Sequence, residues 1–200
     1  SAAQTSWVLM VACKRDLVER RLGWLKQAGL EAGAVDVDAL ALANAFAQGR
    51  NGRQTSGSYA LLNLGGQWTN LVMLKDGIPY LVRDLPWGAA RLAHQVAGSL
   101  GVEEPAVSAQ LRHGSGAVPP ETAEAMKTAC ESVTTDLQLS FDFFESQFGS
   151  QPDRVLVSGG LSRCPGVLEA LKNHLAQPLT PWEPEGLNSQ FAVAYGLALR

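Results

Sequence analysis

The sequence predicts an α/β protein in which strands and helices alternate along the chain. Three observations lead to this prediction. Short apolar runs of strand length alternate with longer segments whose apolar residues recur every three or four positions, the period of a helix. Tight Gly-Gly and Asp-Gly turns separate three consecutive strand-like runs in the middle of the sequence. Near the carboxyl end, another short apolar run ends in two glycines and leads into a helical pattern.

Composition excludes several classes of protein. The chain has 200 residues, 46% of them apolar, which is enough for a packed core and excludes intrinsic disorder. A net charge of −3 with 18% charged residues gives no basic surface for nucleic acid. No apolar run approaches the roughly 18 residues that span a bilayer, and no signal peptide is visible. Because the first residue is Ser1 rather than a methionine, we expect a fragment of a longer protein.

The cysteines give no sign of a disulfide framework or a zinc site. Cys13, Cys130 and Cys164 lie far apart and form no Cys-x-x-Cys pair. The three histidines are equally scattered. We therefore expect reduced thiols in a cytosolic protein, and no metal site.

The first segment predicts strand, helix, strand and helix. Residues 7–12 are a continuous apolar run, typical of a buried strand. Residues 16–29 have a helical period that ends at a glycine. Residues 34–37 suit a short strand, and residues 38–47 suit a helix for which Asp38 is the expected N-cap. Residues 48–57 lose the period and predict a loop.

The middle of the chain predicts a meander of three strands, at residues 58–64, 69–75 and 78–84. Gly65-Gly66 and Asp76-Gly77 form the two turns, and Asp-Gly is a strong hairpin signal because both residues tolerate a positive φ.

Helices follow the meander. They are expected from residue 88 to about 100 and from 104 to 111, followed by a loop at 114–120 and a long helix over 121–148. The long helix carries an apolar stripe that indicates a core helix. The stripe consists of Met126, Cys130, Val133, Leu137, Phe141, Phe144 and Phe148. Residues 154–158 predict a buried strand, and two last helices are expected over 165–176 and 189–199.

Two segments could carry chemistry. In residues 63–70, a glycine pair between two strands exposes backbone N–H groups that can hold phosphate oxygens, although a plain hairpin turn has the same pattern. In residues 156–166, a strand ends in Gly159-Gly160 before a helix, so another group can approach the backbone closely. The second segment is neither a Walker motif nor a Rossmann fingerprint. No nucleophile elbow is present, and no residue is assigned as catalytic.

Taken together, the two turns and the helices between them resemble the second half of an actin-like (ribonuclease-H-like) ATPase. In that superfamily a phosphate-binding hairpin comes first and a strand–Gly-Gly adenosine motif comes last. An ordered set of further segments narrows the resemblance to the type IV pilus assembly protein PilM family, which includes MshI-type and competence-associated homologues. These segments are residues 28–30, 35–38, 75–79, 83–88, 137–147 and 194–200.

The resemblance implies an incomplete actin-like fold. Residues 1–54 would be a partial first lobe, with the end of its inserted subdomain at residues 1–33. Residues 55–200 would be the second lobe. The family's first phosphate loop has no counterpart in this sequence.

The resemblance also implies a nucleotide site that departs from the family pattern. Asn63 stands where the family hairpin has an aspartate, and a neutral amide does not hold hydrated Mg²⁺ as a carboxylate does. Trp68 stands where a hydroxyl residue is expected, so that its ring could fill phosphate space, and only Thr69 remains of the hydroxyl pair. We therefore expect ATP contact, with doubtful Mg²⁺, to survive better than hydrolysis. The implied cofactor-binding residues are Asn63, Gly65, Gly66, Thr69, Ser158, Gly159, Gly160 and Ser162.

The function that the resemblance implies is that of a scaffold. The chain would belong to a cytoplasmic actin-fold component of type IV or MSHA-like pilus biogenesis, peripheral to the inner membrane. Its partner would be the N-terminal tail of a PilN-like membrane protein. Two alternatives stay open: an active ATPase or sugar-kinase-like enzyme of the same superfold, and the cytoplasmic domain of a type II secretion L-type protein. The sequence leaves the oligomeric state open.

Overall fold

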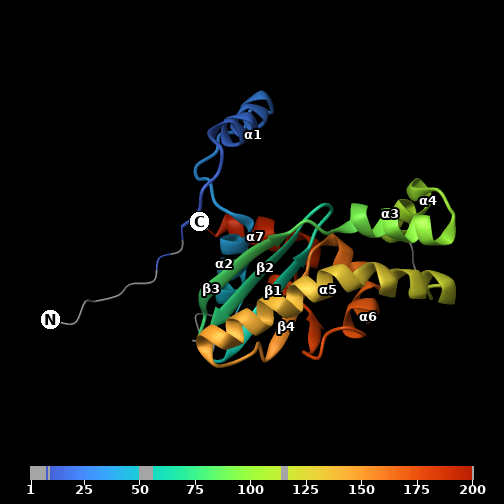
Figure 1. Ribbon diagram of the computed structural model, residues 1–200. Helices are drawn as coiled ribbons and strands as arrows, with labels where there is room; N and C mark the ends of the chain where they lie inside the picture. Colours follow the sequence, from blue (N-terminus) through green and yellow to red (C-terminus); the bar gives the residue numbers. More distant parts are fainter. Residues whose placement is uncertain (1–7, 9, 50–55, 114–116, 200) are drawn as a thin grey trace. The chain divides into compact units, whose positions relative to one another are not determined.

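Figure 1 shows the computed structural model of the chain, which describes residues 8, 10–49, 56–113 and 117–199. Its elements form a mixed α/β fold, as the sequence predicts. Two compact units can be distinguished, Ser1–Asp36 and Val37–Arg200. The lobe boundary expected between residues 54 and 55 lies outside the described residues, and it stays a prediction.

The first unit contains helix α1, Arg15–Gln27, which confirms the predicted helix. The helix ends two residues before Gly29, whose φ is 74°. The strand expected at residues 7–12 is wrong for the residues described there. Residues 8 and 10–12 have no regular structure, and Val8 and Met10 are 81% and 86% exposed. An apolar run becomes a strand only where another strand takes up its N–H and C=O groups, and these residues have no such partner in the described part of the chain. Trp7 and Leu9 lie outside that part.

The segment where the two units join departs from the prediction in two ways. Residues 34–37 are not a strand, because they join no sheet. Helix α2, Asp38–Gln48, confirms the next predicted helix, but its N-cap is Val37 and Asp38 is its first residue. Asp38 therefore contributes a negative charge to the first turn rather than a cap.

The second unit is built on a five-stranded sheet in the order β3-β2-β1-β4-β5. Strands β1 (Ser58–Leu64), β2 (Thr69–Lys75) and β3 (Ile78–Leu85) form the predicted antiparallel meander. Strand β4 (Arg154–Ser158) was also predicted, and it pairs parallel to β1. Strand β5 (Leu179–Pro181) pairs parallel to β4 and was missed, because three residues that include a proline show no alternation.

Helices cover both faces of the sheet (Figure 1). The larger core lies under α3 (Ala89–Leu100), α4 (Glu104–His113), α5 (Pro120–Phe148) and α6 (Val167–Lys172). The predicted apolar stripe of α5 is buried there from Met126 to Phe144, which confirms a core helix. Helix α6 ends four residues before the predicted end, where the chain turns toward β5.

The opposite face of the sheet is covered by α2 and α7 (Ala192–Ala198). The last predicted helix, over residues 189–199, consists of two short pieces. A single 3₁₀ turn, Ser189–Phe191, comes first, and α7 follows it. Gly196 of α7 lies against the backbone of Ala41 in α2, and a Cβ at this position would overlap the carbonyl group of Ala41. Only glycine allows the two helices to pack this closely.

Gly196→Ala should lower the free energy of unfolding by about 2 kcal/mol, because the added methyl must push α7 away from α2. Urea denaturation of the purified protein measures this change. The matched control is Gly98→Ala in α3, where an added Cβ meets nothing within 4 Å. That control should raise stability by up to about 1 kcal/mol, since alanine is the better helix former. Equal effects of the two substitutions would contradict the packing described for Gly196.

Candidate functional site

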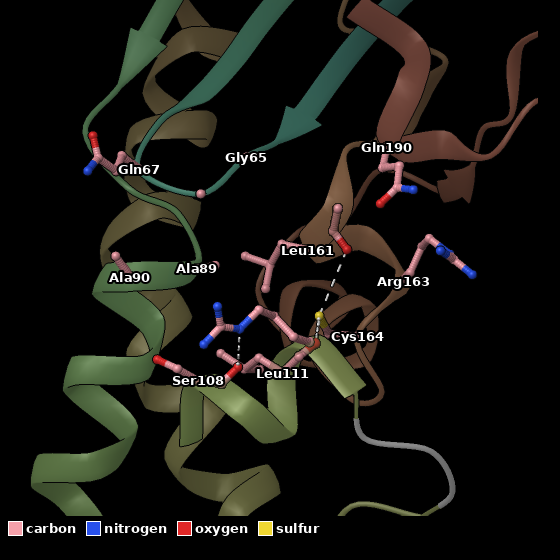
Figure 2. A pocket seen from close by; sticks show the side chains of 13 residues that line it. Gly65, Gln67, Ala89, Ala90, Ser108, Leu111, Leu161, Arg163, Cys164 and Gln190 are labelled. Carbon is pink, nitrogen blue, oxygen red and sulfur yellow. Dashed lines mark hydrogen bonds between the residues drawn. The ribbon is translucent and has the colours of Figure 1, made fainter. Parts of the chain in front are cut away.

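Parallel pairing of β1 with β4 brings the two glycine turns to one edge of the sheet. Asn63 lies in register with Ser158, so the two strands leave the sheet at the same end. A cavity of about 630 Å³ opens there, and Gly65, Gly66 and Gly160 line it (Figure 2). The two turns therefore converge on one cavity.

Gly159 is required by the backbone geometry between the two turns. Its φ is 92°, and a Cβ there would lie 2.7 Å from the backbone nitrogen of Leu64. Its own N–H donates to the carbonyl of Ser189 at 3.0 Å. The second turn is thus pressed against the end of β1, and any side chain at this position would separate them.

The first turn is fixed to the beginning of α3. The N–H groups of Ala89 and Ala90 donate to the carbonyls of Gly65 and Gly66 at 3.0 and 2.9 Å. A Cβ on Gly88 would lie 2.7 Å from the Gly65 carbonyl oxygen, so this approach also needs a glycine. The turn carbonyls therefore satisfy N–H groups that a helix start otherwise leaves without partners.

The three predicted hydroxyl residues lie behind the cavity walls rather than line the cavity. Ser162 is buried, and its Oγ donates to the Gly159 carbonyl at 2.7 Å. Thr69 is fully buried, and its Oγ1 donates to the Trp87 carbonyl at 2.8 Å. Ser158 is also fully buried. The hydroxyls of Ser162 and Thr69 hold the segments beside the turns in place, and none of the three residues belongs to the described lining of the cavity.

Asn63 and Trp68, the two departures from the family pattern, lie beside the first turn. The Asn63 Nδ2 donates to Asn70 Oδ1 at 3.0 Å, along the edge of the sheet. Trp68 is 53% exposed and is not part of the described lining. The expectation that its ring fills phosphate space is therefore wrong, because the hairpin turns this side chain outward to solvent.

The other walls of the cavity come from segments that the sequence analysis did not single out. Figure 2 shows Ala89 and Ala90 on one side, with Arg163 and Gln190 on the other. Two arginines, Arg112 from α4 and Arg163 from the 3₁₀ turn after β4, belong to the lining, and the described lining contains no acidic side chain. The cavity therefore favours an anionic ligand. The remaining lining residues are Gln67, Ser108, Leu111, Leu161 and Cys164.

No local pattern points to Arg112, and only one points to Arg163. Arg112 lies in a short helix, and its Nε donates to the Ser108 carbonyl at 3.2 Å, which holds the guanidinium beside that helix. Arg163 follows the second glycine pair by three residues, which is the one signal that places it near the site. Within the described residues, no group of three or more His, Cys, Asp or Glu side chains is arranged to hold a metal ion.

The sequence matches the family of type IV pilus assembly protein PilM over residues 1–200. The chain belongs to this family. The expected membership is therefore confirmed. The actin-like fold is confirmed by the solved structures that match, which include an archaeal actin homolog, Ta0583. None of the helices in the described ranges has the length and apolar character needed to cross a membrane.

Solved structures agree with the assignment. The match to a PilM-PilN type IV pilus biogenesis complex covers 92% of this PilM-family chain and 57% of the matched chain in that complex, at 26% identity and a TM-score of 0.77. The match to the ethanolamine utilization protein EutJ from Carboxydothermus hydrogenoformans covers 88% of this chain and 58% of EutJ, at 19% identity and a TM-score of 0.62. The match to MreB 5 of Spiroplasma citri bound to AMPPNP covers 94% of this chain and 64% of MreB 5, at 12% identity and a TM-score of 0.65. The last two show the shared fold, and this chain spans somewhat more than half of these proteins.

The cysteines should react with iodoacetamide in the order Cys13, Cys164, Cys130. Cys13 is exposed. Burial raises the pKa of the Cys164 thiol, although the charge of Arg163 partly offsets this. Burial raises the pKa of Cys130 from 9.0 to about 12, which lowers its thiolate fraction roughly 1,000-fold. Because the thiolate is the nucleophile, slower labelling follows. Peptide mapping by mass spectrometry at neutral pH measures the order, and early labelling of Cys130 would contradict it.

Proposed function

We propose that this chain is the second lobe, with the last part of the first lobe, of an actin-fold component of type IV pilus assembly whose cavity binds a nucleotide. The observation that carries the proposal is the convergence of Gly65, Gly66 and Gly160 on one cavity that also contains two arginines. Its volume, about 630 Å³, lies within the usual range for small-molecule sites, roughly 300 to 1,000 Å³.

The residues present fit a nucleotide. The glycines leave the backbone side of the cavity free of side chains, so a phosphate group can approach it closely. Arg112 and Arg163 supply positive charge from the other elements. Asn63, Thr69, Ser158, Gly159 and Ser162 would act indirectly, by holding the two turns. MreB 5, which shares the fold, has been solved with ADP and with AMPPNP.

Nucleotide turnover is expected to be weak or absent. Phosphoryl transfer depends on charge neutralisation by positioned Mg²⁺. Asn63, at the carboxyl end of β1, offers a neutral amide where a carboxylate would hold the metal's water shell. In this proposal a bound nucleotide sets the conformation of a scaffold, and steady-state phosphate release stays close to the blank.

Arg112→Ala combined with Arg163→Ala should weaken ATP binding roughly tenfold or more, because two charge-assisted contacts to an anion are lost. Isothermal calorimetry on the full-length protein, with and without Mg²⁺, measures the affinity. The matched control is Arg154→Ala, which removes an exposed arginine from the start of β4, at the opposite end of that strand. Equal affinity in the double variant and the control would place the nucleotide elsewhere.

The complete protein is further proposed to act at the cytoplasmic side of the inner membrane, through a PilN-like partner. Support comes from the family and from the PilM-PilN complex, whose PilM chain is only partly spanned by this one. By the resemblance, the partner's N-terminal tail enters a groove of the first lobe. Residues 1–54 would then contribute only part of that groove.

A synthetic peptide with the sequence of the partner's N-terminal tail should retain the full-length protein in a pull-down, and a scrambled peptide should not. Short tail segments that order on binding typically give modest affinities, on the order of micromolar. Fluorescence anisotropy with the labelled peptide measures the affinity. Equal retention by both peptides would contradict the proposed partner.

A further inference from the structure

Helix α5 carries two large apolar side chains on its outer side. Leu139 and Phe143 are 58% and 52% exposed. They lie four positions apart, so they are neighbours on one side of the helix. The buried stripe of α5, which includes Leu137, Phe141 and Phe144, faces the core on the inner side. The pair of Leu139 and Phe143 is therefore an apolar surface that the core does not use.

A hollow of about 390 Å³ begins at Leu139. One rim of the hollow is His174, in the segment after α6, and its Nε2 lies 3.1 Å from the carbonyl oxygen of Lys127 in α5. This contact fixes the rim against the helix. The other described lining residues all come from α5 and are Glu131, Thr134, Thr135, Gln138 and Leu139. The hollow thus offers room for a partner's side chain directly beside the apolar pair.

The charge of α5 is strongly negative. The helix contains six acidic side chains and one lysine, a net charge of −5, whereas the whole chain has −3. Glu131 lines the hollow, and Asp142 lies beside it, because its Oδ1 accepts from Gln138 at 2.9 Å. Both carboxylates are exposed, and neither forms an ion pair with another described residue. The hollow is therefore flanked by negative charge that is not neutralised at close range.

Two nearby cations do not change this. Lys127 Nζ lies 3.7 Å from Glu124 Oε1, one turn before the hollow. Arg83 comes from β3, on the other flank of α5, where it donates to Ser140 Oγ at 2.7 Å. The side of α5 that carries the hollow thus combines exposed apolar side chains with negative charge.

We propose that the hollow and the pair of Leu139 and Phe143 dock a basic amphipathic helix of another protein. Such a helix places its apolar side chains against the pair and its lysines or arginines near Glu131 and Asp142. The α5 face of a second copy is a poor occupant, because it carries the same negative charge.

This surface is distinct from the two sites proposed above. It belongs to the second unit, Val37–Arg200, whereas the groove proposed for the PilN-like tail belongs to the first lobe. The described linings of the hollow and of the glycine-turn cavity have no residue in common. The inference therefore goes beyond the proposed function and requires no nucleotide.

Leu139→Ala combined with Phe143→Ala should weaken the binding of a basic amphipathic helix roughly tenfold, because the apolar anchors are lost. The probe is a labelled synthetic peptide with leucines along one helical face and lysines on the other, and anisotropy with the full-length protein measures its affinity. The matched control is Leu187→Ala with Phe191→Ala, which truncates a leucine and a phenylalanine of similar exposure beside α7. Equal weakening in the two double variants, or no binding to the wild-type protein, overturns the inference.

The charges are tested with the same peptide. Glu131→Gln combined with Asp142→Asn should weaken binding about threefold at low salt and have little effect at 1 M salt, where the Debye length is only about 3 Å. Glu103→Gln with Glu183→Gln removes two exposed carboxylates elsewhere and should change the affinity less. A loss that is the same at every salt concentration contradicts the proposed role of the charges and overturns the choice of a basic partner.

A photo-crosslinking amino acid in place of Leu139, in cells that produce the full-length protein, identifies the natural occupant. Mass spectrometry should find a segment rich in lysine and arginine from another protein, and the same amino acid in place of Phe191 should not capture it. A crosslink from position 139 to an acidic segment, to the PilN-like tail or to a second copy of this chain, whose helix α1 is also basic, overturns the inference. So does the absence of any crosslink specific to position 139.

Discussion

The parallel pairing of β1 with β4 is the constraint on which the site depends. The chain passes through two more strands and three helices between them, yet the register aligns Asn63 with Ser158. Because the two strands run in the same direction, both lead into their turns at one edge of the sheet, the usual place for ligands in α/β folds. Gly159 then passes the backbone of Leu64 too closely for a side chain, so the second turn has little freedom relative to the first.

The cavity at this edge has two chemically different sides. On one side, the turn at Gly65 and Gly66 is fastened by its carbonyls to the start of α3, and the surface is mostly backbone. The other side is made of side chains from α4 and from the turn after β4, with Arg112 and Arg163 among them. If the cavity holds the nucleotide proposed above, the backbone side would receive its phosphates, and discrimination among nucleotides would fall to the side-chain side. The two sides can therefore change independently.

Local sequence patterns predicted the elements that short-range turns and periods determine. They failed where a segment needs a distant part of the chain, such as a neighbouring strand, to form its structure. The meander was predicted nearly to the residue, because Asp76 and Gly77 both adopt the positive φ that an Asp-Gly turn needs. The apolar run at residues 7–12 shows the limit, because no rule of composition tells whether a neighbouring strand exists. The same limit applies to the cavity. The glycines were visible in the sequence, whereas Arg112 reaches the cavity only through the packing of α4, and Trp68 turned out to face solvent.

At this end of the sheet, the register places Ser158, Asn63, Asn70 and Asp84 side by side on four neighbouring strands. The negative charge of this row lies on β3, two strand spacings or roughly 10 Å from Asn63. This distance is similar to the Debye length at physiological salt, about 8 Å, so the charge acts only weakly through space on a group beside Asn63. What reaches Asn63 is the direction of the hydrogen bonds. The Asp84 carboxylate can only accept, so Asn70 donates to it and accepts from Asn63. The orientation of the Asn63 carboxamide is therefore set from within the sheet, by a charge that lies two strands away.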